Sequence, residues 1–113
     1  VTLAKLVESN RFTLYEHFLT DKIGHDQDFA WAKRHLPKLA EMIRTVLENI
    51  NLEKTTFILT SDHGNIEDLS VRNHTLNRVP TIIWGRKRRE IANKINDLSD
   101  ITPAILRVLS SKF

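Results

Sequence analysis

Two short runs of β-branched and aromatic residues constrain the fold of this chain most. They are "TTFILTS" at residues 55–61 and "VPTIIWG" at residues 79–85. A strand that is buried on both faces in a parallel sheet is apolar at consecutive positions, as these runs are. Pro80 falls at the start of the second run, where a missing N–H group is tolerated. The sequence therefore predicts two buried strands separated by a polar segment.

A long amphipathic helix precedes these strands. Between Asp28 and Ile50 the apolar residues recur at steps of three and four, which places them on one face of a helix. Asp26 and Asp28 stand where the dipole at a helix N-terminus favours negative charge. Pro37 lacks a backbone donor, so we expect a kink or a break at that position.

The remaining elements complete an α/β pattern. Residues 1–10 have helical spacing, and two further helical patterns follow the second apolar run. Residues 12–20, "FTLYEHFLT", are rich in β-formers and predict another strand, which ends near Asp21. Strands alternating with helices indicate one α/β domain over residues 1–113, with three strands in a parallel sheet.

Three strands make a thin sheet, because a typical sheet has about five or six. The chain also begins with Val1, inside an apolar periodic stretch. We therefore expect these 113 residues to be part of a longer protein.

Composition excludes several classes of function. The chain has no cysteine, so disulfides, thiolate metal sites and cysteine nucleophiles are impossible. No apolar run approaches the roughly 18 residues that span a membrane, and the N-terminus does not resemble a signal peptide. We expect a cytoplasmic protein without a membrane partner. The net charge of +3 favours anionic partners weakly, and phosphate esters fit it as well as nucleic acid does.

Potential metal ligands gather beyond the ends of two predicted strands. Asp21 is followed by His25, and Asp62 is adjacent to His63. His74 lies in the polar segment just before the next strand. Proteins with parallel α/β sheets bind small molecules and ions beyond the carboxyl ends of the strands. We therefore expect these five side chains at one edge of the sheet.

Carboxylate oxygen and imidazole nitrogen together suit Zn²⁺, Mn²⁺ or Fe²⁺ better than Ca²⁺ or Mg²⁺. Five ligands exceed the needs of one four-coordinate ion and fall short of two closed sites. The set therefore indicates two ions with incomplete shells. Two ions about 3.5–4 Å apart are a recurrent device in phosphoryl chemistry.

Structural interpretations compete with this one. An aspartate after a strand often caps the next turn, and His74 alone could be a solvated loop residue. Gly24 and Gly64 could serve turns that require a positive φ. His17 and His35 have no acidic neighbour at ligand spacing, so we interpret them as a strand residue and a helix-surface residue. We interpret Glu67 and Asp68 as solvated loop acids without a role in the site.

The residues as a set resemble a known family. "TSDHGN" followed by "HTLNRVPTIIWG", together with the upstream "DKIGH", is similar to the C-terminal metal-binding region of the alkaline phosphatase superfamily. The step from His63 to His74 resembles the phosphopentomutases, whereas "DKIGHDQD" resembles the cofactor-independent phosphoglycerate mutases. The resemblance covers residues from about 12 to 110 and implies an alkaline-phosphatase-like fold.

The resemblance also implies roles for the candidate ligands. Asp21, His25 and His74 would hold one divalent ion, Mn²⁺ or Zn²⁺. Asp62 and His63 would help to hold a second ion. The family completes that second site with another aspartate and with a serine or threonine nucleophile near the protein's N-terminus.

Nothing before Asp21 matches that missing element. Thr2, Ser9 and Thr13 do not follow a strand that ends in an acidic residue. Thr60 and Ser61 lie beside the candidate ligands, but the family's nucleophile does not occupy that place. The chain therefore represents either part of a longer phosphomutase or phosphatase, or a degenerate member that binds metal without turnover. In the second case it would dock on another chain.

Basic residues offer two further candidate sites. Arg72 and Arg78 flank His74 and could bind a phosphate or a carboxylate of a small phosphorylated substrate, although a solvated loop explains them equally well. The run "GRKRRE" at 85–90 could contact nucleic-acid phosphates. It has no interleaved aromatic residues and no known binding motif, so we do not expect nucleic acid as a partner.

Overall fold

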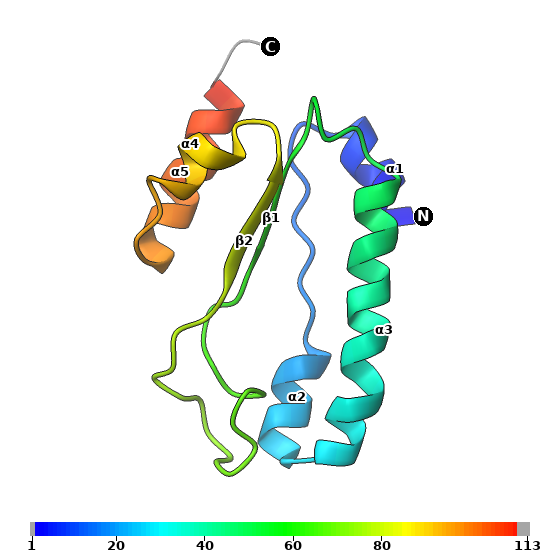
Figure 1. Cartoon of the computed structure of the whole chain (residues 1–113), viewed down its shortest axis with the longest axis vertical. Coiled ribbons are helices and arrows are strands. Elements are labelled where there is room, and N and C mark those ends of the chain that lie inside the picture. Colours follow the sequence, from blue (N-terminus) through cyan, green and yellow to red (C-terminus); the bar gives the residue numbers. More distant parts are fainter. Residues whose placement is uncertain (1, 111–113) are drawn as a thin grey trace.

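The computed structural model describes residues 2–110. In chain order the elements are helices α1 (Thr2–Ser9), α2 (Leu19–Asp26) and α3 (Phe29–Glu48), strands β1 (Thr56–Thr60) and β2 (Thr81–Gly85), helix α4 (Arg88–Ala92), the 3-10 helix η1 (Leu98–Asp100) and helix α5 (Ile101–Ser110). The molecule is elongated, with extents of 46 × 31 × 18 Å. Helix α3 flanks one side of the two strands, and α4 and α5 lie on the other side (Figure 1).

Helix α3 forms where the apolar periodicity predicted it. The side chain of Asp28 caps its N-terminus by accepting a hydrogen bond of 2.7 Å from the backbone N–H of Trp31. Ala32 and Val46 on its apolar face are buried. The helix continues through Pro37, so the break that we considered there does not occur.

The two strands pair with each other in the opposite sense to the one predicted. β1 and β2 are antiparallel, in a register that pairs Ile58 with Ile83 and Thr60 with Thr81. The prediction of a parallel sheet is therefore wrong for this pair. A parallel connection needs a crossover, usually a helix, and residues 61–80 between the strands contain no helix.

The third strand expected at residues 12–20 is absent from the described structure. Residues 12–18 form no regular element, and α2 begins at Leu19. The backbone of residues 12–17 makes no hydrogen bond to the backbone of another described residue. The segment is thus a β-forming sequence without a neighbouring strand to pair with, and its large side chains Phe12, Leu14, Tyr15 and Phe18 are exposed.

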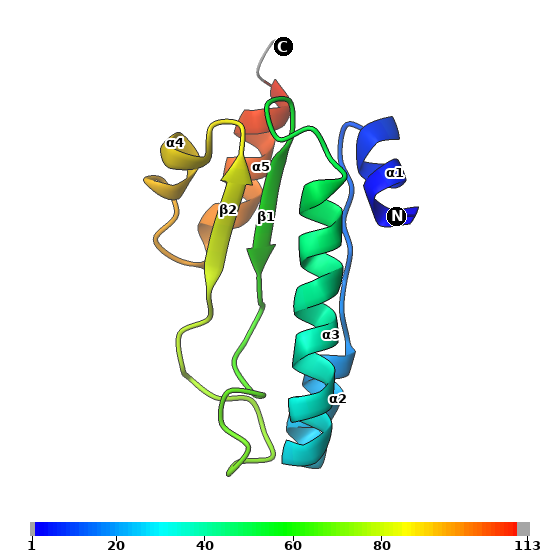
Figure 2. The same ribbon diagram turned by 45° about the vertical axis from the view of Figure 1, so that its right-hand side comes forward.

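One cluster of buried apolar residues lies where α1 meets the end of α3. Ala4 of α1 packs with Val46 and Ile50 at the end of α3, and Leu52 and Phe57 lie against this cluster. Figure 2 shows α1 beside that end of α3. None of the described helices is long and apolar enough to cross a membrane.

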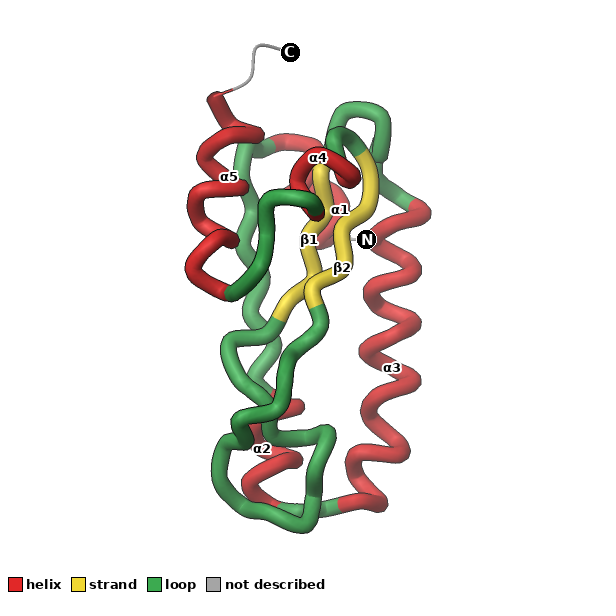
Figure 3. The backbone as a smooth tube through the Cα atoms, turned by 60° about the vertical axis from the view of Figure 1, so that its left-hand side comes forward, coloured by secondary structure: helices red, strands yellow, loops and turns green. Residues whose placement is uncertain are grey.

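The far end of the molecule consists of α2 and the segment that joins the strands. We call residues 61–80 the metal loop. It runs away from β1, turns beside α2 and returns to β2 (Figure 3). The arrangement brings the residues after β1 next to a helix that lies about forty positions earlier in the chain.

Candidate metal centre

Helix α2 carries the first two candidate ligands. Asp21 and His25 are four positions apart, so they lie on the same face of the helix. The Oδ1 atom of Asp21 is 3.4 Å from Nε2 of His25. We predicted a strand end at this point, and a helix turn brings the two side chains together instead.

The metal loop carries the other three. Its two arms meet at an isolated antiparallel bridge between Gly64 and Thr75, where the N–H of Thr75 donates to the carbonyl of Gly64 at 2.9 Å. This bridge sets His63 beside His74. Their rings stack with centroids 3.4 Å apart and an interplanar angle of 15°.

Three imidazoles converge on one carboxylate oxygen. The Nε2 atoms of His25 and His74 lie 3.4 Å and 3.2 Å from Asp21 Oδ1. That of His63 lies 3.7 Å from it. Asp21, His63 and His74 each offer a ligand atom within 4.8 Å of the others. The structure thus joins residues that the resemblance assigns to two different ions.

The convergence point has the chemistry of a metal site. Oδ1 of Asp21 is buried and makes no hydrogen bond with the described residues. A buried carboxylate oxygen without a partner is costly, and such groups in native proteins need an explanation. Two atoms held at about 2.0–2.1 Å by a tetrahedral zinc ion lie about 3.3 Å apart, close to the separations observed here. A divalent transition ion therefore fits these residues.

Asp62 lies at the edge of this group. Its side chain is 84% exposed, and its Oδ1 atom is 3.5 Å from Nε2 of His63. It does not belong to the three residues whose ligand atoms converge. This position suits the partial second site that the resemblance implies.

Hydrogen bonds orient two of the imidazoles. Nδ1 of His25 lies 2.7 Å from the backbone carbonyl of Arg72. Because a carbonyl only accepts, His25 donates from Nδ1, and in the neutral ring the lone pair that can bind a metal is then on Nε2, the nitrogen nearest Asp21. Nδ1 of His63 lies 3.4 Å from the carbonyl of Gly64.

Gly24 joins α2 to the metal loop. A Cβ atom at this position would collide with the side chain of Asn65, a buried residue with a relative exposure of 3%. Neither Gly24 nor Gly64 has a positive φ, so the turn-based interpretation of these glycines is wrong. The absence of a side chain at Gly24 lets Asn65 of the metal loop approach the backbone of α2 closely. At Gly64, a Cβ atom would collide with the side chains of Thr75 and Glu67.

Residues that we interpreted as bystanders make contacts that the sequence did not indicate. Glu67 accepts hydrogen bonds from Asn65, Thr75 and Asn77 and so organises the metal loop. His17 and His35 contact each other, with their Nε2 atoms 2.8 Å apart. Sequence spacing cannot reveal the second pair, because its members lie on α3 and on the irregular segment before α2.

Other residues match their sequence interpretation. Among the described residues, the side chain of Asp68 accepts hydrogen bonds from Ser70 alone, through that residue's N–H and hydroxyl groups. Arg72 and Arg78 are exposed, and their guanidinium groups make no hydrogen bond or ion pair with the described residues. A substrate-binding role for these two arginines stays a prediction.

The hydroxyl groups that we considered are engaged elsewhere. Ser9 and Thr13 donate to the carbonyl of Leu6, and Ser9 also donates to that of Lys5. Ser61, the nearest to the ligands in sequence, donates to the carbonyl of His63 at 2.8 Å. Each of these three hydroxyls is thus hydrogen-bonded to a backbone carbonyl.

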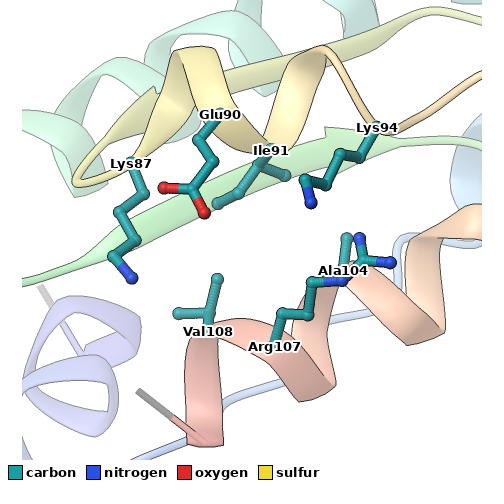
Figure 4. Close-up of a pocket in the computed structure, with 7 residues that line it drawn as sticks. All are labelled: Lys87, Glu90, Ile91, Lys94, Ala104, Arg107 and Val108. Carbon is teal, nitrogen blue, oxygen red and sulfur yellow. The ribbon is translucent and has the colours of Figure 1, made fainter. Parts of the chain in front are cut away.

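A small hollow lies between α4 and α5 (Figure 4). Ile91, Ala104 and Val108 form its apolar surface, and Lys87, Glu90, Lys94 and Arg107 surround them. Its volume of about 30 Å³ accommodates little more than a water molecule. The Glu90 carboxylate also weakens its attraction for anions, so we assign it no ligand.

The cluster of Asp21, His63 and His74 has the residue types of a divalent-metal site. The family profile described as "Metalloenzyme superfamily" matches residues 2–112, and the chain belongs to that family. This result confirms the resemblance to the alkaline phosphatase superfamily noted in the sequence.

Curated relatives point to one group of enzymes. The chain is 31% identical over 88 residues to a 2,3-bisphosphoglycerate-independent phosphoglycerate mutase of Methanococcus vannielii, covering 77% of the chain and 21% of the relative. It is 29% identical over 120 residues to the enzyme of that name from Ehrlichia ruminantium, covering 98% and 24%. It is 38% identical over 77 residues to such a mutase from Archaeoglobus fulgidus, covering 68% and 18%.

The chain thus spans about a fifth of the length of the curated relatives it matches, between 18% and 24% for these three. No solved structure matches it.

Proposed function

We propose that this chain is the metal-binding portion of a two-metal phosphoryl-transfer enzyme that acts on phosphate monoesters, either a phosphomutase or a phosphatase. The observation that carries the proposal is the convergence of three imidazole Nε2 atoms on the buried Oδ1 of Asp21, which makes no hydrogen bond with the described residues. Relatives named as phosphoglycerate mutases support a small phosphorylated substrate.

In this proposal Asp21, His25 and His74 hold one Mn²⁺ or Zn²⁺ ion. Asp62 and His63 contribute to a second site, consistent with the exposed position of Asp62 beside the cluster. The remaining ligands and the nucleophile come from polypeptide outside this chain. The exposed apolar side chains of residues 12–19 support such a neighbour, because Leu14 is 80% and Phe18 68% exposed.

Divalent ions at such a site neutralise charge on a phosphoryl group and activate an oxygen nucleophile. The chain's own residues prepare the site. The Arg72 carbonyl holds His25 in the tautomer that presents Nε2. The Asp21 carboxylate supplies negative charge at the centre of three imidazoles. In this proposal Arg72 and Arg78, which are exposed, attract an anionic substrate from solvent.

Metal analysis tests this proposal. We expect the chain to bind about one transition ion tightly, and His25→Ala or His74→Ala to release it. His35→Ala is the matched control, because His35 lies outside the cluster and should keep the ion. Full retention of metal in both site variants would refute the ligand assignment. We also expect almost no phosphomonoesterase activity from the chain alone, and robust turnover would show that a nucleophile is present.

A second candidate function is a metal-binding domain without catalysis that docks on another chain. The apolar exposure of residues 12–19 favours it equally. The two candidates differ in one measurement. The activity is measured at saturating metal, with the rest of the longer polypeptide or the docking partner present. If the chain is part of an enzyme, a phosphate monoester is hydrolysed or isomerised. If the chain is a docking domain without catalysis, no activity appears.

A further inference from the structure

The carboxylate of Glu67 bridges the two arms of the metal loop. We define the outgoing arm as residues 62–65 and the returning arm as residues 74–77. Oε2 of Glu67 accepts a hydrogen bond of 2.6 Å from the backbone N–H of Asn65, on the outgoing arm. Oε1 accepts from the hydroxyl of Thr75 and, at 3.1 Å, from Nδ2 of Asn77, both on the returning arm.

We propose that Glu67 is a positioning residue that clasps these arms and thereby sets the separation of His63 and His74. The proposal rests on the metal site proposed above. Its geometry is direct, because Asn65 follows His63 by two positions and Thr75 is adjacent to His74. Holding the two anchors together brings the two imidazoles into the stacked arrangement.

Gly64 shows how closely the arms approach. A Cβ atom on Gly64 would collide with both the Thr75 hydroxyl and the Glu67 carboxylate. The backbone bridge between Gly64 and Thr75 joins the arms at the same level. The hydroxyl of Thr75 also accepts a 3.2 Å bond from the N–H of Asn77, which extends the network along the returning arm. Glu67 is therefore part of a hydrogen-bond network that joins the two arms.

The clasp needs a carboxylate in particular. All three of its partners use a donor toward Glu67, and an ionised carboxylate accepts on both oxygens. A glutamine would turn its NH₂ group either toward the N–H of Asn65 or toward the NH₂ of Asn77. In either orientation its NH₂ group would face another hydrogen-bond donor, with no acceptor between them. These bonds, with Thr75 contributing most, also hold the pKa of Glu67 below its ordinary value. The side chain is thus anionic near neutral pH.

Glu67→Gln tests the clasp, and Asp68→Asn is the matched control. Asp68 is the neighbouring acid, but within residues 2–110 its side chain bonds only to Ser70. NMR of the metal-free chain reports whether the ring protons of His63 and His74 remain close. Competition titration with Zn²⁺ reports affinity. We expect Glu67→Gln to lose the ring–ring contact and at least about tenfold in Zn²⁺ affinity, as for other residues that orient metal ligands. The control should keep both.

A rescue variant separates positioning from simple loss of structure. In Glu67→Gln combined with Asn77→Asp, the glutamine NH₂ can donate to the new carboxylate while its oxygen accepts from Asn65. We expect this pair to regain the ring contact and most of the affinity. If Glu67→Gln does not fold, Thr75→Val removes one bond of the clasp and takes its place in both measurements.

Unchanged ring contact and affinity in Glu67→Gln, or in Thr75→Val where that variant replaces it, would overturn the proposal. An equal loss in Asp68→Asn would do the same, because it would indicate a general charge effect. If the unaltered chain binds no Zn²⁺, the proposed metal site fails. The NMR contact still decides whether Glu67 positions the two histidines.

Discussion

The rings of His63 and His74 stack at 3.4 Å between centroids although they lie on opposite arms of the metal loop. Their Nε2 atoms both lie near Oδ1 of Asp21, at 3.7 Å and 3.2 Å. Three segments thus meet at one carboxylate oxygen: α2, the start of the metal loop and its end. The arrangement makes this oxygen the centre of the site, and changes there should have opposite effects on stability and on metal binding.

The first prediction concerns Asp21→Asn. Without metal, the variant should be as stable as the unaltered chain or more stable by up to about 1 kcal/mol, because a buried carboxylate oxygen that accepts no hydrogen bond from the described residues is replaced by part of a neutral amide. With Zn²⁺, it should lose the stabilisation that a bound ion provides. Urea denaturation with and without metal measures both effects. Asp26→Asn, on the same helix, should keep the metal-dependent gain. Strong metal-dependent stabilisation of Asp21→Asn would contradict the prediction.

The second prediction concerns the contact between α2 and the metal loop. Gly24→Ala should destabilise the chain by about 1–3 kcal/mol, because the new methyl group collides with Asn65. Alanine otherwise favours a helix over glycine by about 1 kcal/mol, so the sign distinguishes packing from propensity. Denaturation of Gly24→Ala, Asn65→Ala and the double variant measures the coupling. The double variant should recover much of the loss, and strict additivity would argue against the contact.

The third prediction concerns pH and the paired histidines His17 and His35. Burial, and then the charge of His35, lower the pKa of His17. The unfolded chain therefore binds more protons than the folded chain at pH values between the lowered pKa and about 6.5. The stability contribution of His17 is complete above about pH 6.5 and is lost as the pH falls through that window.

Denaturation between pH 5 and 8 in the presence of EDTA should therefore show a steeper acid loss of stability in the unaltered chain than in His17→Gln. EDTA removes metal binding at the other histidines from the comparison. Equal slopes in the two chains would show that His17 does not contribute.

The fourth prediction concerns the start of α3. Asp28→Ala should cost about 1 kcal/mol, because it removes the side-chain cap on the N–H of Trp31. Zn²⁺ affinity should not change, since the cap lies outside the candidate ligands. Asp26→Ala is the control, because its exposed pair with Lys22 contributes little. Chemical denaturation and Zn²⁺ titration of both variants provide the comparison, and an equal cost in both would refute the capping role.

Local patterns in the sequence predicted most of the elements. The apolar periodicity of residues 28–50 gave rise to α3, and the β-branched runs at 55–61 and 79–85 contain β1 and β2. These features depend on residues within a few positions of one another. The expected helices at both ends also form, as α1, α4 and α5.

Residues 12–20 show where local pattern was insufficient. Their composition favours a strand, but a strand requires a partner for its backbone, and no described segment pairs with residues 12–17. The helix α2 forms instead over the last part of that stretch and carries Asp21. Likewise, nothing in β1 or β2 alone specifies that they run antiparallel, because pairing depends on the path of the metal loop.

The sequence by itself determined which residue types are available for a metal, namely Asp21, His25, Asp62, His63 and His74. Only the tertiary structure decided that His63 joins Asp21 and His74, that Asp62 lies at the edge, and that Glu67 and Gly24 shape the site. The physical reason is the range of the interactions. Helix and strand preferences act between neighbours in the chain, whereas a ligand cluster depends on contacts between α2 and a loop about forty positions away.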